Sequence, residues 1–222
     1  MKFSDHLRRQ AREIWDAILG HPFVSELGDG SLPPNKYLYY IKQDYVYLLD
    51  FSRCLGIAAA KATAPDDMNT LSGLMNGCLS YEMGILRGHL EELGLSRGDV
   101  DGIVMAPTNH AYTRHMLAVA YSGSVAENLA SLLPCMWTYQ LIGEKLWEEK
   151  PEALGGHYLE WVEGYRSDEY RGLVDKYLNM IDRLGEAASL EERSAMVNHF
   201  IASSRYEYMF WDMAYGLEEW PI

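Results

Sequence analysis

The sequence predicts an all-α protein that folds as a single-domain helical bundle over residues 1–222. Apolar residues recur at helical spacing in nearly every segment, beginning with Phe3, Leu7, Ile14 and Ile18. No segment shows the sustained apolar-polar alternation of a strand, and the connections between segments are short. Because no sequence period repeats, a bundle is favoured over a helical repeat protein.

The predicted elements follow one another with turns between them. The first helix covers residues 3–19 and ends at Gly20, and a short element begins at His21. Glycine and proline within residues 28–34 separate this element from a long helix over 35–63. Further helices are predicted over residues 67–93, 109–122, 125–149, 157–164, 167–184 and 190–215.

Serine and glycine mark several of the predicted helix ends. Ser124, Ser167 and Ser189 each precede a helix, and their hydroxyls can accept hydrogen bonds from the N–H groups of its first turn. Gly185 is predicted to stop the helix that begins after Ser167, and Leu93 is the predicted end of an earlier helix.

The charge and cysteine content exclude several classes of partner. The chain has 19 Lys and Arg against 32 Asp and Glu, a formal net charge of −13 that repels nucleic-acid phosphates and anionic membranes. No apolar run has the length of a membrane span, and the N-terminus lacks the apolar core of a signal peptide. Three cysteines cannot all pair within one chain, so a reducing cytoplasmic location is expected.

Cys135 follows Pro134 inside a long apolar segment that is predicted to be helical. Proline lacks the N–H donor of a helix interior, so its position beside a thiol calls for a reason. Tyr139 lies one helical turn beyond the thiol, on the same face. A lone buried cysteine usually behaves as a small apolar residue, which is the interpretation for Cys54 and Cys78. For Cys135 the alternative is a reactive thiol in an aromatic pocket.

A second cluster places an acidic residue between aromatic residues. Tyr40, Asp44, Tyr47 and Phe51 fall on one face of the predicted helix over 35–63. An unpaired buried carboxylate is costly, so Asp44 requires a partner there. A bound heterocycle would provide one; an arginine, a lysine or a solvated groove edge is the alternative.

A third cluster surrounds Glu207, which shares a helical face with Phe210. An apolar setting would raise the pKa of this carboxyl group toward values useful for proton donation, whereas a structural ion pair would not. Together, one thiol and two carboxyl groups in different environments could supply a nucleophile, an anchor and an acid.

The motifs of several other site types do not occur in the sequence. Glu82 and His89 share a helical face and His110 lies near His115, but no Glu-x-x-His pair of a di-iron bundle is found. Glycine-rich phosphate loops and the Gly-x-Ser-x-Gly elbow of esterases are also missing. We therefore expect no metal site and no cofactor.

Six segments in the same order along nearly the whole chain carry a resemblance to a known family. They are His21–Val24, Asp29–Leu32, Tyr40–Phe51, Leu133–Tyr139, Trp161–Tyr165 and Tyr206–Ala214. In these segments the chain resembles the TenA family, also called thiaminase II or aminopyrimidine aminohydrolase, which has the all-α heme oxygenase-like fold. The collinear order is more specific than any one of the motifs.

The resemblance implies hydrolysis of 4-amino-5-aminomethyl-2-methylpyrimidine to the 5-hydroxymethyl pyrimidine with release of ammonia, and cleavage of thiamin as a further activity. It implies that Cys135 is the nucleophile, Glu207 the acid/base, and Asp44 the anchor for the ring amino group and its neighbouring nitrogen. It also implies a homotetramer. The remaining substrate-binding residues that it implies are Tyr47 and Tyr112, with hydroxyls near the thiol, and Tyr139, Tyr165 and Phe210, as walls of the pocket.

Two other functions remain open from the sequence. One is an oxidase or oxygenase on the same fold, which bound iron would favour. The other is a non-enzymatic pyrimidine-binding or regulatory protein, which binding without turnover would favour.

Overall fold

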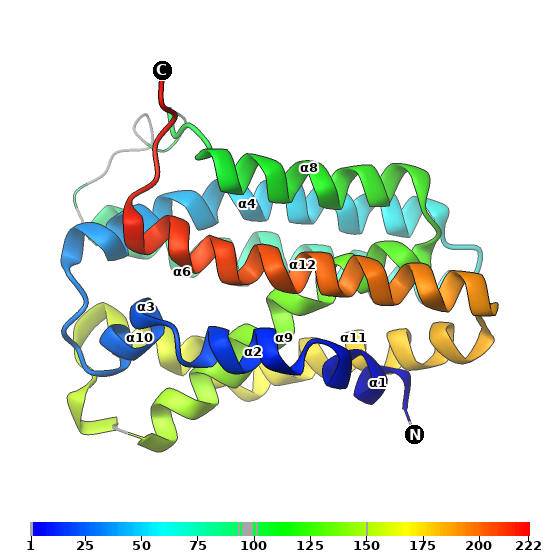
Figure 1. Cartoon of the computed structure of the whole chain (residues 1–222), viewed down its shortest axis with the longest axis horizontal. Coiled ribbons are helices and arrows are strands. Elements are labelled where there is room, and N and C mark those ends of the chain that lie inside the picture. Colours follow the sequence, from blue (N-terminus) through cyan, green and yellow to red (C-terminus); the bar gives the residue numbers. More distant parts are fainter. Residues whose placement is uncertain (1, 93, 95–99, 101, 150) are drawn as a thin grey trace.

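The computed structural model describes residues 2–92, 94, 100, 102–149 and 151–222. These residues form helices joined by turns, with no strand among them (Figure 1). The predicted all-α bundle is therefore confirmed. No helix in the described ranges combines the length and the apolar character that crossing a membrane requires.

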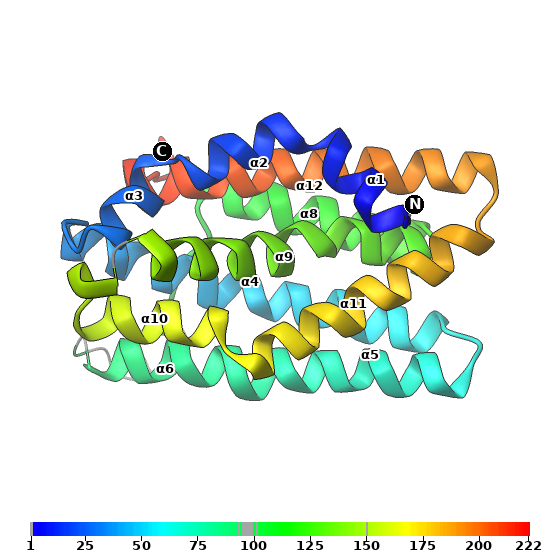
Figure 2. The ribbon, with the colours of Figure 1, turned by 90° about the horizontal axis from the view of Figure 1, so that it is seen from below.

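The first half of the chain contains three short helices, one long helix and a composite rod. The helices are α1 (Phe3–Gln10), α2 (Arg12–Leu19), α3 (Pro22–Gly28), α4 (Pro34–Lys61), α5 (Pro65–Gly77) and α6 (Met83–Glu92). A π-helical turn over Cys78–Glu82 joins α5 to α6, so the three make one rod along the lower edge of Figure 2. Proline occupies the first turn of α3, α4 and α5, where its missing N–H costs no hydrogen bond.

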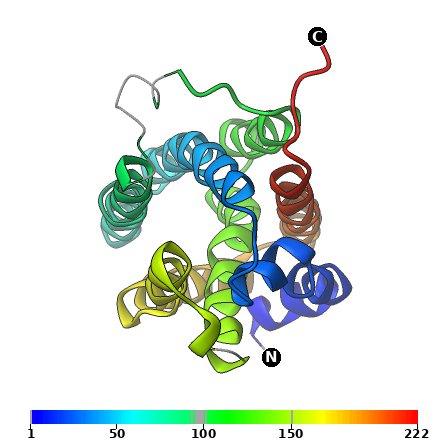
Figure 3. The ribbon, with the colours of Figure 1, turned by 90° about the vertical axis from the view of Figure 1, so that its left-hand side faces the viewer.

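The second half contains the helix at the centre of the molecule. The helices of this half are α8 (Pro107–Ser122), α9 (Val125–Glu149), α10 (Gly156–Arg166), α11 (Asp168–Ala187) and α12 (Leu190–Gly216), with a 3₁₀ turn over Pro151–Ala153. The central helix is α9. Helix α9 contacts α12, α10, α11, α8 and α4. In Figure 3 it lies between the other helices, in lime green. A side chain on α9 can therefore meet side chains from most of the bundle.

The three predicted serine caps are confirmed. Ser124 Oγ accepts from the Glu127 N–H at 3.2 Å, and Ser167 and Ser189 make the corresponding bonds at 3.1 and 3.2 Å. Each bond satisfies one N–H group that has no partner within its helix. The predicted end at Leu93 lies outside the described residues.

Two predicted boundaries differ from the structure. The single helix expected over residues 3–19 is interrupted at Ala11, which allows α1 to contact α11 while α2 contacts α9. Gly185 does not stop α11, which continues to Ala187. Glycine is needed there for space, because a Cβ atom at this position would lie 2.9 Å from Phe3 Cβ.

Candidate active site

Cys135 lies near the middle of α9, directly after Pro134, and is 5% exposed. Burial raises the pKa of its thiol well above the ordinary value, and the nearby Glu207 carboxyl group raises it further. The nearby Tyr47 hydroxyl opposes this rise in the pKa. The free protein therefore holds Cys135 as a neutral thiol, and reaction at this sulfur requires a route for its proton.

A series of polar side chains leads from this thiol to a carboxyl group on another helix. Tyr47, on α4, lies beside both Cys135 and Tyr112, and its ring centroid is 5.1 Å from that of Tyr112. Tyr112, on α8, donates its hydroxyl proton to Glu207 Oε1 at 2.7 Å. The Tyr47 hydroxyl also lies 3.4 Å from Met116 Sδ. The side chains of four helices thus form the series Cys135, Tyr47, Tyr112, Glu207.

Glu207, on α12, is 2% exposed and has no cationic partner among the described residues. Burial raises its pKa from 4.5 to about 8, and the hydrogen bond from Tyr112 opposes the rise. This direction is the one expected of a carboxyl group in an apolar setting. At neutral pH the carboxyl group carries a proton that it can donate.

Asp44, on α4, lies on the other side of the same aromatic cluster. It accepts a hydrogen bond from the Tyr40 hydroxyl at 3.1 Å, and Tyr40 in turn accepts one from Trp161 Nε1 at 3.0 Å. Burial raises the pKa of Asp44 from 3.8 to about 7, which the Tyr40 hydrogen bond opposes. Within the described part of the chain, no arginine or lysine forms an ion pair with it. The ion-pair alternative for Asp44 therefore has no support.

Aromatic rings fill the space around these polar groups. Phe210 packs against Tyr47 with ring centroids 5.6 Å apart, and Tyr139 packs against Tyr165 at 4.9 Å and against Trp211 at 5.3 Å. All of these side chains are buried. The structure thus brings together all eight residues singled out from the sequence: Asp44, Tyr47, Tyr112, Cys135, Tyr139, Tyr165, Glu207 and Phe210.

One buried acid near this cluster was not identified as part of it from the sequence. Glu82 lies on the π-helical turn and is 6% exposed. Burial and the charge of Asp44 raise its pKa to about 8, and a hydrogen bond with Cys78 opposes the rise. The sequence offered Glu82 only as a companion of His89 on one helical face. Cys54 and Cys78 are buried free thiols, as expected of core residues.

Comparison with known proteins shows which family the chain belongs to. The sequence pattern of the TENA/THI-4/PQQC family matches residues 8–217. The chain belongs to this family. A TenA homologue from P. horikoshii has a solved structure that matches with a TM-score of 0.89 at 34% identity, covering 97% of this chain and 99% of that one.

A sequence relative of this TenA-family chain carries a name that describes an activity. The aminopyrimidine aminohydrolase of Halalkalibacterium halodurans is 38% identical over 220 residues, which are 99% of this chain and 98% of that protein. Heme oxygenase 2 from Chlamydomonas reinhardtii matches with a TM-score of 0.69 at 14% identity, covering 96% of this chain and 97% of that one. The second likeness concerns the fold alone, and it agrees with the expected heme oxygenase-like bundle.

Proposed function

We propose that this protein is an aminopyrimidine aminohydrolase that converts 4-amino-5-aminomethyl-2-methylpyrimidine and water to the 5-hydroxymethyl pyrimidine and ammonia, and that also cleaves thiamin. The observation that carries the proposal is the path from the Cys135 thiol through Tyr47 and Tyr112 to Glu207, enclosed by aromatic rings. The name of the full-length relative supports the choice of substrate.

Asp44 fits the amino group and the neighbouring nitrogen of such a ring. With a pKa of about 7, the carboxyl group is readily protonated near neutral pH. Its O–H can then donate to the ring nitrogen while its carbonyl oxygen accepts from the amino group. The aromatic rings beside it provide stacking surfaces for a flat heterocycle.

Cys135 and Glu207 would divide the covalent chemistry between them. Glu207 donates its proton to a ring nitrogen while the sulfur bonds to the ring carbon beside the aminomethyl-bearing carbon. The thiol proton passes through Tyr47 and Tyr112 to Glu207, which restores the acid. This transfer leaves no net charge on the buried sulfur, whose thiolate is unfavourable here.

Loss of ring aromaticity then allows the exocyclic C–N bond to break. The amine takes one proton and leaves as ammonia, and water adds to the exocyclic methylene group. The proton released by that water replaces the one taken by the amine. Expulsion of the sulfur and loss of the proton on the ring nitrogen restore the aromatic ring, so the protein is unchanged after each turnover. The step requires no cofactor.

The test is release of ammonia from the aminopyrimidine, and of the thiazole from thiamin, by the purified protein. Cys135→Ala should abolish turnover, since the ring carbon then has no nucleophile. Cys54→Ala is the matched control, because it removes another buried thiol of the same chain. The proposal is wrong if the wild-type protein releases neither product, and the nucleophile assignment is wrong if Cys135→Ala turns over at the wild-type rate.

We also propose, from family resemblance, that the protein assembles as a homotetramer. The three free thiols are consistent with function in the reducing cytoplasm. Light scattering on the purified protein tests the assembly, with an expected mass of about 100 kDa from four chains of 25.3 kDa.

A further inference from the structure

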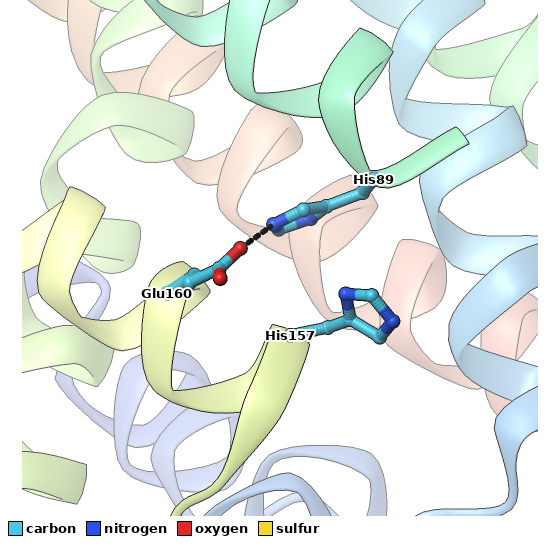
Figure 4. A group of neighbouring side chains, drawn as sticks. All are labelled: His89, His157 and Glu160. Atoms are coloured by element: carbon cyan, nitrogen blue, oxygen red, sulfur yellow. Dashed lines mark hydrogen bonds and ion pairs between the residues drawn. The ribbon is translucent and has the colours of Figure 1, made fainter. Parts of the chain in front are cut away.

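A second group of chemically active side chains lies outside the Cys135 cluster, where α6 meets α10. His89 comes from α6, and His157 and Glu160 come from the first turns of α10 (Figure 4). One ligand atom from each lies within 4.8 Å of the other two. Imidazole nitrogens and a carboxylate are ligands of zinc and related transition metals.

The contact between His89 and Glu160 already has the spacing of two ligands on one metal ion. Nε2 of His89 lies 3.2 Å from Oε2 of Glu160, the pair joined by the dashed line in Figure 4. Two ligands at about 2.0–2.1 Å from a tetrahedral ion are about 3.3 Å apart. Glu160 is exposed, with 56% of its side-chain surface accessible, so its carboxylate can move by the ångström or so that closes the group around an ion.

The hydroxyl group of Tyr37, on α4, contacts Nδ1 of His89, whose other nitrogen, Nε2, faces Glu160. This hydroxyl donates to the His157 carbonyl oxygen at 3.3 Å and lies 3.0 Å from His89 Nδ1. When Nδ1–H of His89 donates to this hydroxyl oxygen, the neutral ring keeps the lone pair of Nε2 for a metal ion. Nε2 and the Glu160 carboxylate face each other at 3.2 Å, so a cation can replace the proton between them.

We propose that His89, His157 and Glu160 bind one divalent transition-metal ion of the zinc, cobalt and nickel class, with Tyr37 orienting His89. The ion joins α6 to α10 and leaves at least one position for water, because three protein ligands do not complete a tetrahedron. Tyr37 contacts Tyr40, which holds Asp44, with ring centroids 6.1 Å apart. The metal therefore stabilises one end of the substrate cluster without taking part in the reaction.

Titration of the untagged full chain with Co²⁺, followed by visible absorption, tests the site. We expect one equivalent with the intense d–d bands of a four-coordinate ion and no near-ultraviolet thiolate charge-transfer band, which separates this site from binding at Cys135. His157→Gln and Glu160→Gln should each weaken binding at least tenfold. Tyr37→Phe, which keeps the ring, should weaken it about 10- to 100-fold, as loss of an orienting hydrogen bond does.

Two matched controls identify the site. Glu163→Gln changes an exposed carboxylate on α10 that lies outside the group. His199→Gln disrupts the other histidine pair, in which His199 lies beside His115 and Glu127. Both controls should bind Co²⁺ as the wild type does. The proposal is overturned if the wild type binds no Co²⁺, if His157→Gln and Glu160→Gln bind it equally well, or if His199→Gln abolishes binding. None of these outcomes depends on the aminohydrolase activity.

Discussion

Asp44 and a bound aminopyrimidine with a neutral ring would form two parallel hydrogen bonds only if the carboxyl group carries a proton. Asparagine offers the same pattern of one donor and one acceptor, whereas alanine offers neither. We therefore expect Asp44→Ala to raise KM about 10- to 100-fold with a smaller change in kcat, and Asp44→Asn to retain most of the binding. Steady-state kinetics on the aminopyrimidine measure both. If the asparagine variant binds as poorly as the alanine variant, the ionised carboxylate is the binding form.

Glu207 is expected to act on the rate rather than on binding. Glu207→Gln keeps the size of the side chain and its contact with Tyr112, but it cannot transfer a proton. We expect kcat to fall by about 10²- to 10⁴-fold with little change in KM. Tyr206→Phe, on the preceding residue, removes a hydroxyl group outside the proton path and serves as the control. A kcat within a few-fold of wild type for Glu207→Gln would exclude this group as the acid.

The sequence identified these two acids because each is surrounded by aromatic residues at helical spacing. The partner of Asp44 could not be chosen in the same way. Spacing on α4 placed Tyr40 beside it, but Trp161, which fixes the Tyr40 hydroxyl, comes from α10, more than a hundred residues away along the chain. Glu82 was missed for a related reason, since its relation to Asp44 arises from packing between α4 and the π-helical turn.

At the scale of elements, serine caps correctly predicted where helices begin, whereas a glycine did not by itself show where a helix ends. A serine cap acts within four residues, so Ser124, Ser167 and Ser189 could be assigned from local sequence alone. A glycine can end a helix or make room for a neighbour, and local sequence does not distinguish the two. At Gly185 the neighbour is Phe3, from the opposite end of the chain.

This second role of Gly185 can be measured. In an exposed helix interior, replacing glycine by alanine stabilises by about 1 kcal/mol. Here the added Cβ would collide with the base of the Phe3 side chain, so we expect Gly185→Ala to lower the free energy of unfolding by about 1–3 kcal/mol. Urea denaturation measures the change. Gly172→Ala, on the same helix with open space around it, is the control and should be neutral or stabilising.

The π-helical turn over Cys78–Glu82 shows a second limit on prediction at this scale. Its residues fit the 3.6-residue apolar pattern, so the sequence predicted one uninterrupted helix over 67–93. The structure inserts a wider turn there, and Glu82 at its end is directed into the buried cluster. Such turns often occur at functional sites because they change the direction of side chains without ending the helix.

For the whole molecule, the fold class followed from the sequence because helical periodicity is a local property repeated along the chain. The central position of α9 did not, since it depends on contacts between helices distant in sequence. The sequence indicates which distant residues meet only through the resemblance of six collinear segments to one family. Those segments contribute residues from α4, α9, α10 and α12 to the same buried cluster.

The buried acids of this cluster should make the stability of the whole molecule depend on pH. Their pKa values rise from 3.8 to about 7 for Asp44, and from 4.5 to about 8 for Glu82 and Glu207. Between pH 4.5 and 7–8 the folded protein therefore binds more protons than the unfolded chain, and its stability falls as the pH rises through this range. Each acid contributes at most about 1.4 kcal/mol per pH unit, and above its folded pKa no further loss occurs.

Urea denaturation of the ligand-free protein at pH 6, 7 and 8, at one protein concentration, measures this dependence. Glu82→Gln cannot ionise, so its free energy of unfolding should fall less between pH 6 and pH 8 than that of the wild type. Glu163→Gln removes an exposed carboxylate and should leave the slope unchanged, which separates the effect from a general reduction of the negative charge. Equal slopes for the wild type and Glu82→Gln would mean that Glu82 is ionised in the folded protein throughout this range.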